Sequence, residues 1–422
     1  MRIAKKNLFH NFNVFFFIGA FILIFNPPLL KVNAMHIVGV CSLVYLFFNI
    51  NQTILILRKT EIPMLLFGFI GIFLYLLIVV WLYNGRPLLN TVMPIYFIVD
   101  IIPFGMAVRI YANKHNCQSE DFLHLLIQTG KVQAILAILA FFILSVRTYF
   151  LNMLLDYGYT DYFKVLSGYR IYGLSSSLTF AMPVIQTIFA LLLLYPNKKG
   201  KIDIVGALLL FFSAIINARI AIVVAGLGLL ILIFFGRFST TRKIMLIGSL
   251  LITVLVLVNV ALPLIEEYSP GTYKWLISGI EDIYAFLGGD NSSVYFSYAT
   301  GAEQYRIPDD FLSVLIGRGH TTMSADALKY GYQSDIGFIN DIWIGGVFYI
   351  VMLYSLYIRY MFKLFKSPKS RISFIGILML LMIPIINIKG QAFSKASFIV
   401  FLFLICIVEL SGTQKATKLE EG

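Results

Sequence analysis

Residues 62–83 read IPMLLFGFIGIFLYLLIVVWLY, a stretch of 22 residues without a charged side chain. An α-helix rises about 1.5 Å per residue and the hydrocarbon core of a bilayer is about 30 Å thick, so about 20 apolar residues cross it. Similar stretches recur along the 422-residue chain, which is 59% hydrophobic and 13% charged. Because soluble domains carry about 25% charged residues, the composition predicts an all-α polytopic integral membrane protein and excludes a nucleic-acid partner.

The same criterion predicts about twelve transmembrane helices in a single polytopic membrane domain that covers residues 1–422. The expected spans are 13–32, 35–53, 62–83, 88–110, 130–146, 174–195, 202–218, 220–236, 244–265, 335–358, 372–388 and 392–410. Two extracytoplasmic loops are long, at 147–173 and, between the ninth and tenth helices, at 266–334. Apolar clusters at 275–283 and 311–316 predict short helices in a folded cap.

The basic residues predict how these helices are oriented. With the N-terminus in the cytoplasm, 21 of the 33 Lys and Arg residues fall on the cytoplasmic side, although the segments on that side are shorter. We therefore expect both termini in the cytoplasm and attribute most of the net charge of +12 to orientation. A signal peptide is the less favoured alternative, because the first apolar run exceeds a typical signal-peptide core. The three cysteines have no metal-site or disulfide spacing.

Three arginines on the outer side have an unusual context. Arg219 lies in a tight turn between two expected spans, so its guanidinium lies near the membrane surface. Arg170 precedes Gly173 and a run of serines, which predict a cap for the next helix and a positive helix end beside the arginine. Arg318 lies between two glycines whose amides can form an anion nest. Guanidinium groups, a positive helix end and backbone amides all bind phosphate. The structural alternatives are that Arg219 only anchors a helix end, that the serines beside Arg170 only cap a helix, and that the segment around Arg318 is an ordinary turn.

Two carboxylates stand six residues apart at the predicted start of the tenth span, at Asp335 and Asp341. Acids at the membrane edge are costly unless they pair with cations or take part in chemistry. Asp335 is therefore either a helix cap or a group that orients or deprotonates a substrate hydroxyl.

Asp100 lies deep in the fourth expected span, between two prolines. An acid inside a span marks a functional site or a structural ion pair. Lys389 and Lys395, near the outer ends of the last two spans, are its expected partners.

These features together resemble the bacterial O-antigen and capsule polymerase family (Wzy type), which is related to the O-antigen ligases. The resemblance rests on about a dozen spans with cytoplasmic ends, the long loop before the tenth span and the turn Asn217-Ala218-Arg219. It also rests on Gly317-Arg318-Gly319, followed by Asp335, ten residues and Gly346. The ligase branch usually carries His where this chain has Asp335, which favours a polymerase.

The resemblance implies metal-independent, inverting glycosyl transfer at the outer face of the bacterial cytoplasmic membrane. A glycan on undecaprenyl pyrophosphate passes to a sugar hydroxyl of a lipid-linked repeat unit. The implied catalytic residues are Asp335 and Arg219, and the implied residues that bind pyrophosphate or glycan are Arg170, Arg219, Arg318, Tyr172 and His320. No cofactor is expected. The expected partners are the lipid-linked oligosaccharides, membrane lipid, and chain-length regulator and flippase proteins.

Other functions remain open at this point. An O-antigen ligase would share most of these features, and a polysaccharide or lipid-linked oligosaccharide transporter (flippase) would account for Asp100. A purely structural membrane protein would leave the outer arginines unexplained. Asp309, Asp310, Glu266 and Glu267 are the weaker alternative of an ion site.

Overall fold

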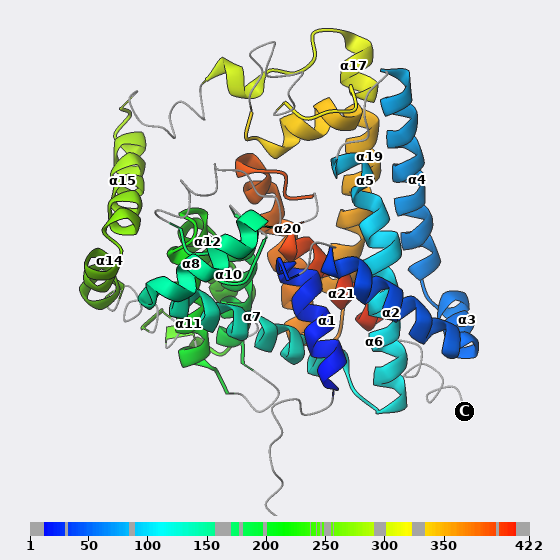
Figure 1. The fold of residues 1–422 in the computed structure, drawn as a ribbon, viewed down its shortest axis with the longest axis horizontal. Coiled ribbons are helices and arrows are strands. Elements are labelled where there is room, and N and C mark those ends of the chain that lie inside the picture. Colours follow the sequence, from blue (N-terminus) through cyan, green and yellow to red (C-terminus); the bar gives the residue numbers. More distant parts are fainter. Residues whose placement is uncertain are drawn as a thin grey trace, which may run out of the picture.

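The computed structural model describes residues 12–29, 33–83, 89–156, 170–176, 180–196, 201–236, 238–241, 243–244, 247–248, 255, 257–290, 301–322, 334–393 and 396–410. Within these ranges the chain forms helices and loops, and no strand (Figure 1). The helices are α1 Val14–Phe25, α2 Ala34–Phe48, α3 Ile50–Lys59, α4 Ile62–Leu82, α5 Leu89–Tyr96, η1 Phe97–Ile101, α6 Ile102–Lys114, α7 Ser119–Phe142, α8 Leu144–Asp156, α10 Ala181–Leu194, α11 Ile204–Ile215, α12 Ile220–Phe235, η2 Leu257–Ala261, α14 Leu262–Tyr268, α15 Pro270–Leu287, η3 Ala302–Tyr305, α17 Phe311–Ile316, α19 Gly337–Phe365, α20 Ser370–Lys389 and α21 Ser397–Leu410.

Five of the described helices are long and apolar enough to cross a membrane, and a bent pair makes a sixth. The five are Ile62–Leu82, Met93–Lys114, Ser119–Phe142, Gly337–Phe365 and Ser370–Lys389, and the bent pair is α2 with α3. Five more apolar helices are shorter, namely α1, α10, α11, α12 and α21. The all-helical fold and the membrane-embedded character are therefore confirmed. The number of twelve spans and their orientation stay predictions.

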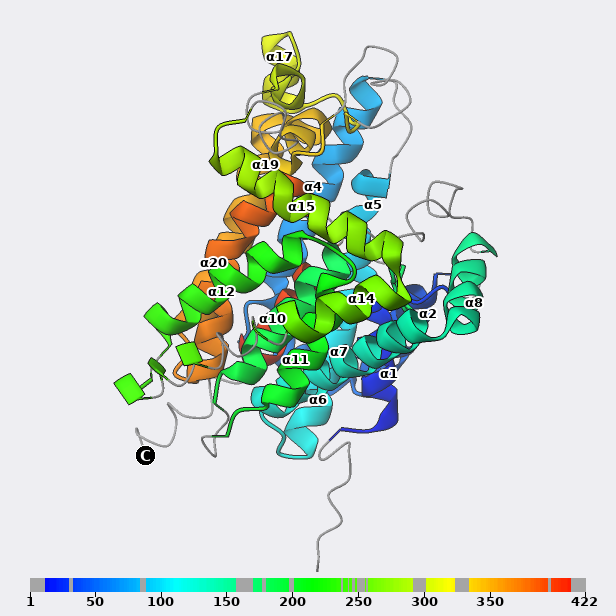
Figure 2. The same ribbon diagram turned by 90° about the vertical axis from the view of Figure 1, so that its left-hand side faces the viewer.

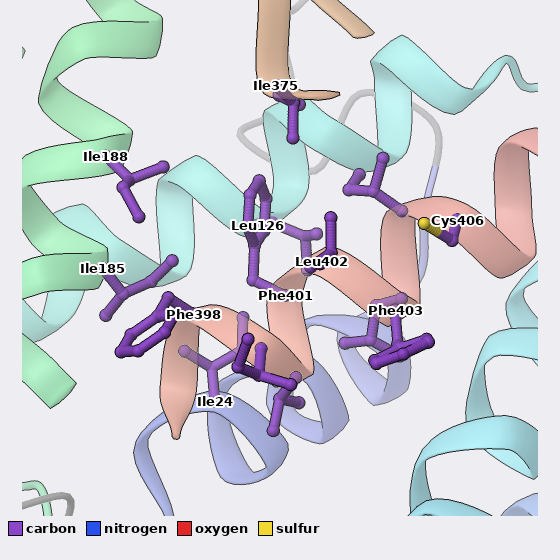
Figure 3. Packing of buried hydrophobic residues seen from close by; sticks show 14 of the residues in the cluster. Ile24, Leu126, Ile185, Ile188, Ile375, Phe398, Phe401, Leu402, Phe403 and Cys406 are labelled. Carbon is purple, nitrogen blue, oxygen red and sulfur yellow. The ribbon is translucent and has the colours of Figure 1, made fainter. Parts of the chain in front are cut away.

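The short helix α21 lies at the centre of the largest core. Its sequence SFIVFLFLICIVEL is apolar on every side apart from Ser397 and Glu409 near its ends, which is typical of a helix that is buried all round. Phe398 and Phe401 are fully buried, and Ile24 of α1, Ile185 of α10 and Ile375 of α20 surround the same helix (Figure 3). Because lipid tails are as apolar as these side chains, close packing rather than burial holds the helices together.

The second predicted span is not one continuous helix. The chain turns through 98° between α2 and α3. Polar side chains build the turn: the Asn49 amide donates to the carbonyl of Tyr45 at 2.8 Å, and the Thr53 hydroxyl donates to that of Leu46 at 3.0 Å. An apolar count over 35–53 averages across these polar residues, so it predicted a span where the structure has a bend.

Two further boundaries differ from the prediction. The fifth expected span, 130–146, is α7, which starts earlier, at Ser119. A capping box begins the helix there: the backbone N–H of Gln118 donates to Asp121 at 2.7 Å. The first turns of α7 are polar, so an apolar count does not detect them. The expected loop 147–173 begins as helix α8, and its residues 157–169 lie outside the described ranges.

The long loop contains the helices that its apolar clusters predict. The cluster 275–283 lies inside α15, and the cluster 311–316 coincides with α17. Figure 2 shows α14 and α15 lying across α11, where Ile265 and Leu276 share a small core with Ile215 and Ile216. Part of the ninth expected span, 244–265, lies outside the described residues, and its last residues form η2 and the start of α14.

Asp100 has a different partner from those expected. Its carboxylate is fully buried in the π-helical turn η1, with Oδ2 3.0 Å and Oδ1 3.2 Å from Nδ1 of His36 on α2. Lys389 lies instead beside Asp335, 3.5 Å from its Oδ2, so that expected pairing is wrong. Lys395 lies outside the described residues.

Candidate functional site

Arg219 lies in the turn between α11 and α12, and its side chain reaches across to α15. Its Nη2 donates to the backbone carbonyl of Trp275 and, at 2.6 Å, to the hydroxyl of Ser278. Its guanidinium carbon lies 4.9 Å from the centre of the Trp275 ring. Gly279 makes this approach possible, because a Cβ there would lie 2.4 Å from both Cδ and Nε of Arg219.

Arg170 approaches the same indole ring from another segment. Its guanidinium carbon lies 5.2 Å from the centre of the Trp275 ring. The fully buried Asn217 fixes this arrangement: its Oδ1 accepts from the backbone N–H of Ile171 at 3.0 Å, in the turn that carries Arg219. The structure thus brings together two of the three predicted arginines. Cation–π contact with the same ring stabilises each of the two guanidinium groups.

A small pocket, open to solvent, adjoins Arg170. It is lined by Ala140 of α7, by Arg147, Phe150, Leu151 and Leu154 of α8, and by residues 170–173. The predicted binding residue Tyr172 is buried in this lining, and its carbonyl accepts from the Gln133 amide at 2.7 Å. The pocket thus combines cations with an apolar wall.

Arg147 is a candidate that the sequence did not single out. It lies on α8, half-buried, and burial lowers the pKa of its guanidinium. An arginine keeps its proton even so, which means that its charge is held partly out of water. An anionic ligand in the pocket would offset that cost. The position of Arg147 beside Arg170 depends on how α8 packs, which the sequence does not show.

The predicted helix cap beside Arg170 is wrong. The hydroxyls of Ser175 and Ser176 donate to the carbonyls of Phe25 and Asn26, at 3.0 and 2.5 Å, where α1 ends. The following helix, α10, starts later, with Phe180 in the capping position and no side-chain hydrogen bond. These two serines satisfy carbonyls that the end of α1 leaves unpaired, so they do not cap the start of α10.

Arg318 belongs to a second group of residues, around α17 and the start of α19. Its guanidinium pairs with Asp310 at 2.7 Å and donates to the Ser313 hydroxyl at 3.1 Å. The hydrogen bond from Arg318, helped by Ser313, lowers the pKa of Asp310 to about 2. The predicted anion nest is wrong, because the amides of Arg318 and Gly319 donate to the carbonyls of Trp343 and Ile344, at 2.7 and 3.0 Å.

His320 and Asp335 also lie in this second group. The rings of His320 and Trp343 are 5.5 Å apart, and the Arg318 guanidinium carbon lies 5.4 Å from the Trp343 ring centre. Asp335 is one-third exposed, with 34% of its side chain accessible, and faces Lys389. It is not a helix cap, because α19 starts at Gly337 and has no side-chain cap. Asp341 is buried and accepts from the Tyr354 hydroxyl at 2.6 Å.

The two groups are carried by elements that lie apart. Helix α15, which carries Trp275, and helix α17, which precedes Arg318, are on opposite sides of Figure 1. One site was predicted from the sequence, whereas the structure has an Arg170–Arg219–Trp275 group and an Arg318–His320–Asp335 group. Among the described residues, no group of three or more His, Cys, Asp and Glu side chains is placed to hold a metal ion.

Comparison of the chain with protein-family models, curated proteins and solved structures found no significant match. The fold and the two groups therefore define a class: an all-helical, membrane-embedded protein with two arginine–tryptophan clusters near the ends of its helices.

Proposed function

We propose that the protein is a bacterial polysaccharide polymerase, for O-antigen or capsule, which works at the outer face of the cytoplasmic membrane without a metal ion. The observation that carries the proposal is the convergence of Arg170 and Arg219 on Trp275, with Arg147 in the adjoining pocket. Three cations are costly in a membrane-embedded protein and are retained where they meet an anionic substrate.

The chemistry suits these residues. In inverting transfer from a lipid-linked glycan, the leaving group is a diphosphate, which is already stable as an anion. The protein then has to stabilise accumulating negative charge rather than supply a strong acid. Arg170 and Arg219 offer planar forks that match phosphate geometry, and the apolar wall of α8 suits the hydrocarbon next to the diphosphate.

The second group is assigned to the glycan. Asp335 binds a glycan hydroxyl away from the reacting carbon, and Lys389 holds its carboxylate in place. The acceptor hydroxyl that attacks lies at the diphosphate end, beside Arg170 and Arg219, and its proton passes to the departing diphosphate. Arg318, His320 and Trp343 provide polar and aromatic contacts for sugars. The long loop carries Trp275 at one end and Arg318 at the other, so a glycan that follows it would contact both groups.

The test of this function is the glycan ladder of a strain that lacks the gene. A polymerase defect leaves one repeat unit on the final acceptor, and expression of the gene restores the ladder. A ligase defect leaves bare acceptor with polymer still on the carrier lipid. A flippase defect traps the repeat unit on the cytoplasmic side. Either of the last two patterns would replace the polymerase assignment.

Gly279→Ala provides a local test of the Arg219 position. The added Cβ displaces the guanidinium from α15, and we expect polymer yield to fall about tenfold, as for a mispositioned charge-stabilising group. Gly226→Ala on α12 is the matched control, because a Cβ there meets nothing within 4 Å. The measurement is the glycan ladder at equal membrane levels of both variants. Equal ladders would mean that Arg219 need not lie against α15.

A further inference from the structure

The bend between α2 and α3 is held rigidly. The carbonyl of Asn49 accepts from the backbone N–H groups of Gln52 and Thr53, both at 3.0 Å, and thereby starts α3 in its new direction. The ammonium of Lys114, at the end of α6, donates to the Asn49 side chain at 2.6 Å. Helix α3 consequently projects from the foot of α4, at the edge of the molecule (Figure 1).

An exposed, mainly apolar face continues from α2 onto α3, where Asn51 is a polar residue on it. On α2 it consists of Val40, Leu43, Val44 and Phe47, which are 55, 44, 50 and 73% exposed. It continues through Phe48, Ile50 and Ile54, which are 78, 49 and 40% exposed. The opposite side of α3, with Thr53 and Ile56, is buried against the protein. Helix α2 has 15 residues and is about 22 Å long, which is shorter than the hydrocarbon core. The polar groups at the bend, Asn49 and Lys114, are costly in hydrocarbon and favour a bend at its boundary.

Positive charge lines the end of the same helix. Arg58 and Lys59 occupy the last turn of α3, and both are exposed. Neither forms an ion pair with a carboxylate of the described residues. The next acid, Glu61, is already engaged by Arg359, at 3.0 Å, and by Lys363. Two cations are thus left beside an apolar face that is continuous with the lipid-facing surface of α2.

We infer that α3 lies in the plane of the membrane surface, with Ile50 and Ile54 in the hydrocarbon boundary and Arg58 and Lys59 on the headgroups of anionic phospholipids. A helix with an apolar stripe and a basic end is typical of such interfacial segments. An acidic protein would match the charges but not the apolar stripe, which continues the exposed apolar surface of α2. By the basic-residue rule this is the cytoplasmic leaflet.

The depth of α3 is measured with a fluorescent label in the full-length protein. An environment-sensitive dye is attached to Ile54→Cys in a Cys41→Ala background, where the remaining cysteines, Cys117 and Cys406, are buried. In phosphatidylglycerol vesicles we expect blue-shifted emission that headgroup-level quenchers reduce more than quenchers at the acyl-chain end. Leu74→Cys, at the middle of α4, should show the reverse. Water-like emission at position 54, or quenching like that at position 74, would overturn the interfacial placement.

The lipid preference is measured as thermal stabilisation of the detergent-solubilised protein. Phosphatidylglycerol should raise the Tm, whereas phosphatidylcholine should not. Arg58→Gln or Lys59→Gln should raise the phosphatidylglycerol concentration for half of the effect about fivefold each, since each basic residue near a lipid surface contributes independently. Lys274→Gln, an exposed charge on α15, is the control and should change nothing. Unchanged half-effect concentrations in both α3 variants, or stronger stabilisation by a polyglutamate peptide, would overturn the assignment to lipid.

Discussion

Replacement of Arg219 by alanine is expected to abolish polymer growth while the protein still inserts into the membrane. The change removes the cation, its bond to Ser278 and its contact with the Trp275 ring. Loss of one preorganised charge-stabilising donor costs about 10²- to 10³-fold in rate. Arg219→Lys keeps the charge but cannot form the guanidinium fork, so most of the activity should still be lost. The readout is the glycan ladder, with membrane levels measured by immunoblot.

Lys274→Ala is the matched control for Arg219→Ala. It removes a cation from α15, one residue before Trp275, but its side chain is exposed rather than directed at the ring cluster. We expect an unchanged ladder. Normal long-chain glycan in Arg219→Ala cells would contradict the role of Arg219, and an equal defect in both variants would mean that the general charge of this region matters rather than the Arg219 contacts.

The sequence was sufficient to predict the fold class and the arginines, but not their grouping. Apolar run length follows from bilayer thickness, so helices such as α4 and α20 are visible in the sequence alone. The sequence does not show that Arg170 and Arg219 contact the same ring. Trp275 is distant from both along the chain, and only tertiary packing brings it to them. Arg147 was missed for a related reason, since a short helix with mixed residues such as α8 does not stand out by hydropathy.

The predictions drawn from local sequence motifs were wrong for a common reason. The amides around Arg318 were correctly predicted to donate hydrogen bonds, but their acceptors are on a distant segment, at Trp343 and Ile344. The serines at 175 and 176 were predicted to accept at a helix start, whereas they donate to carbonyls at the end of α1. A sequence shows which donors exist, whereas the choice between a ligand and a carbonyl from another helix depends on the fold. Asp335 differs from these cases, because its side chain faces Lys389 and remains accessible to a substrate.

Gly346, the last residue of the Asp335-to-Gly346 spacing, has a structural explanation. It interrupts α19 with φ 65° and ψ −167°, a backbone conformation that is essentially restricted to glycine. The loop after α17 packs against the resulting kink, where the Gly317 backbone lies against that of Gly345. The Tyr75 hydroxyl donates to the carbonyls of Ile316 and Gly345, at 3.2 and 2.8 Å. A Cβ on residue 346 would lie 2.3 Å from the Leu315 carbonyl oxygen.

Gly346→Ala should therefore destabilise the first turns of α19 more than Gly279→Ala or Gly226→Ala destabilises its own helix. The backbone conformation alone costs about 1–3 kcal/mol for a residue with a side chain, and the clash with α17 adds to this. We expect a lower Tm in detergent and loss of the second group's function, since the loop that carries Arg318 can no longer dock. Gly71→Ala on α4, where a Cβ meets nothing within 4 Å, should leave the Tm unchanged. If Gly346→Ala keeps the wild-type Tm but loses polymer, the glycine acts through substrate contact, and the spacing to Asp335 is then functional rather than architectural.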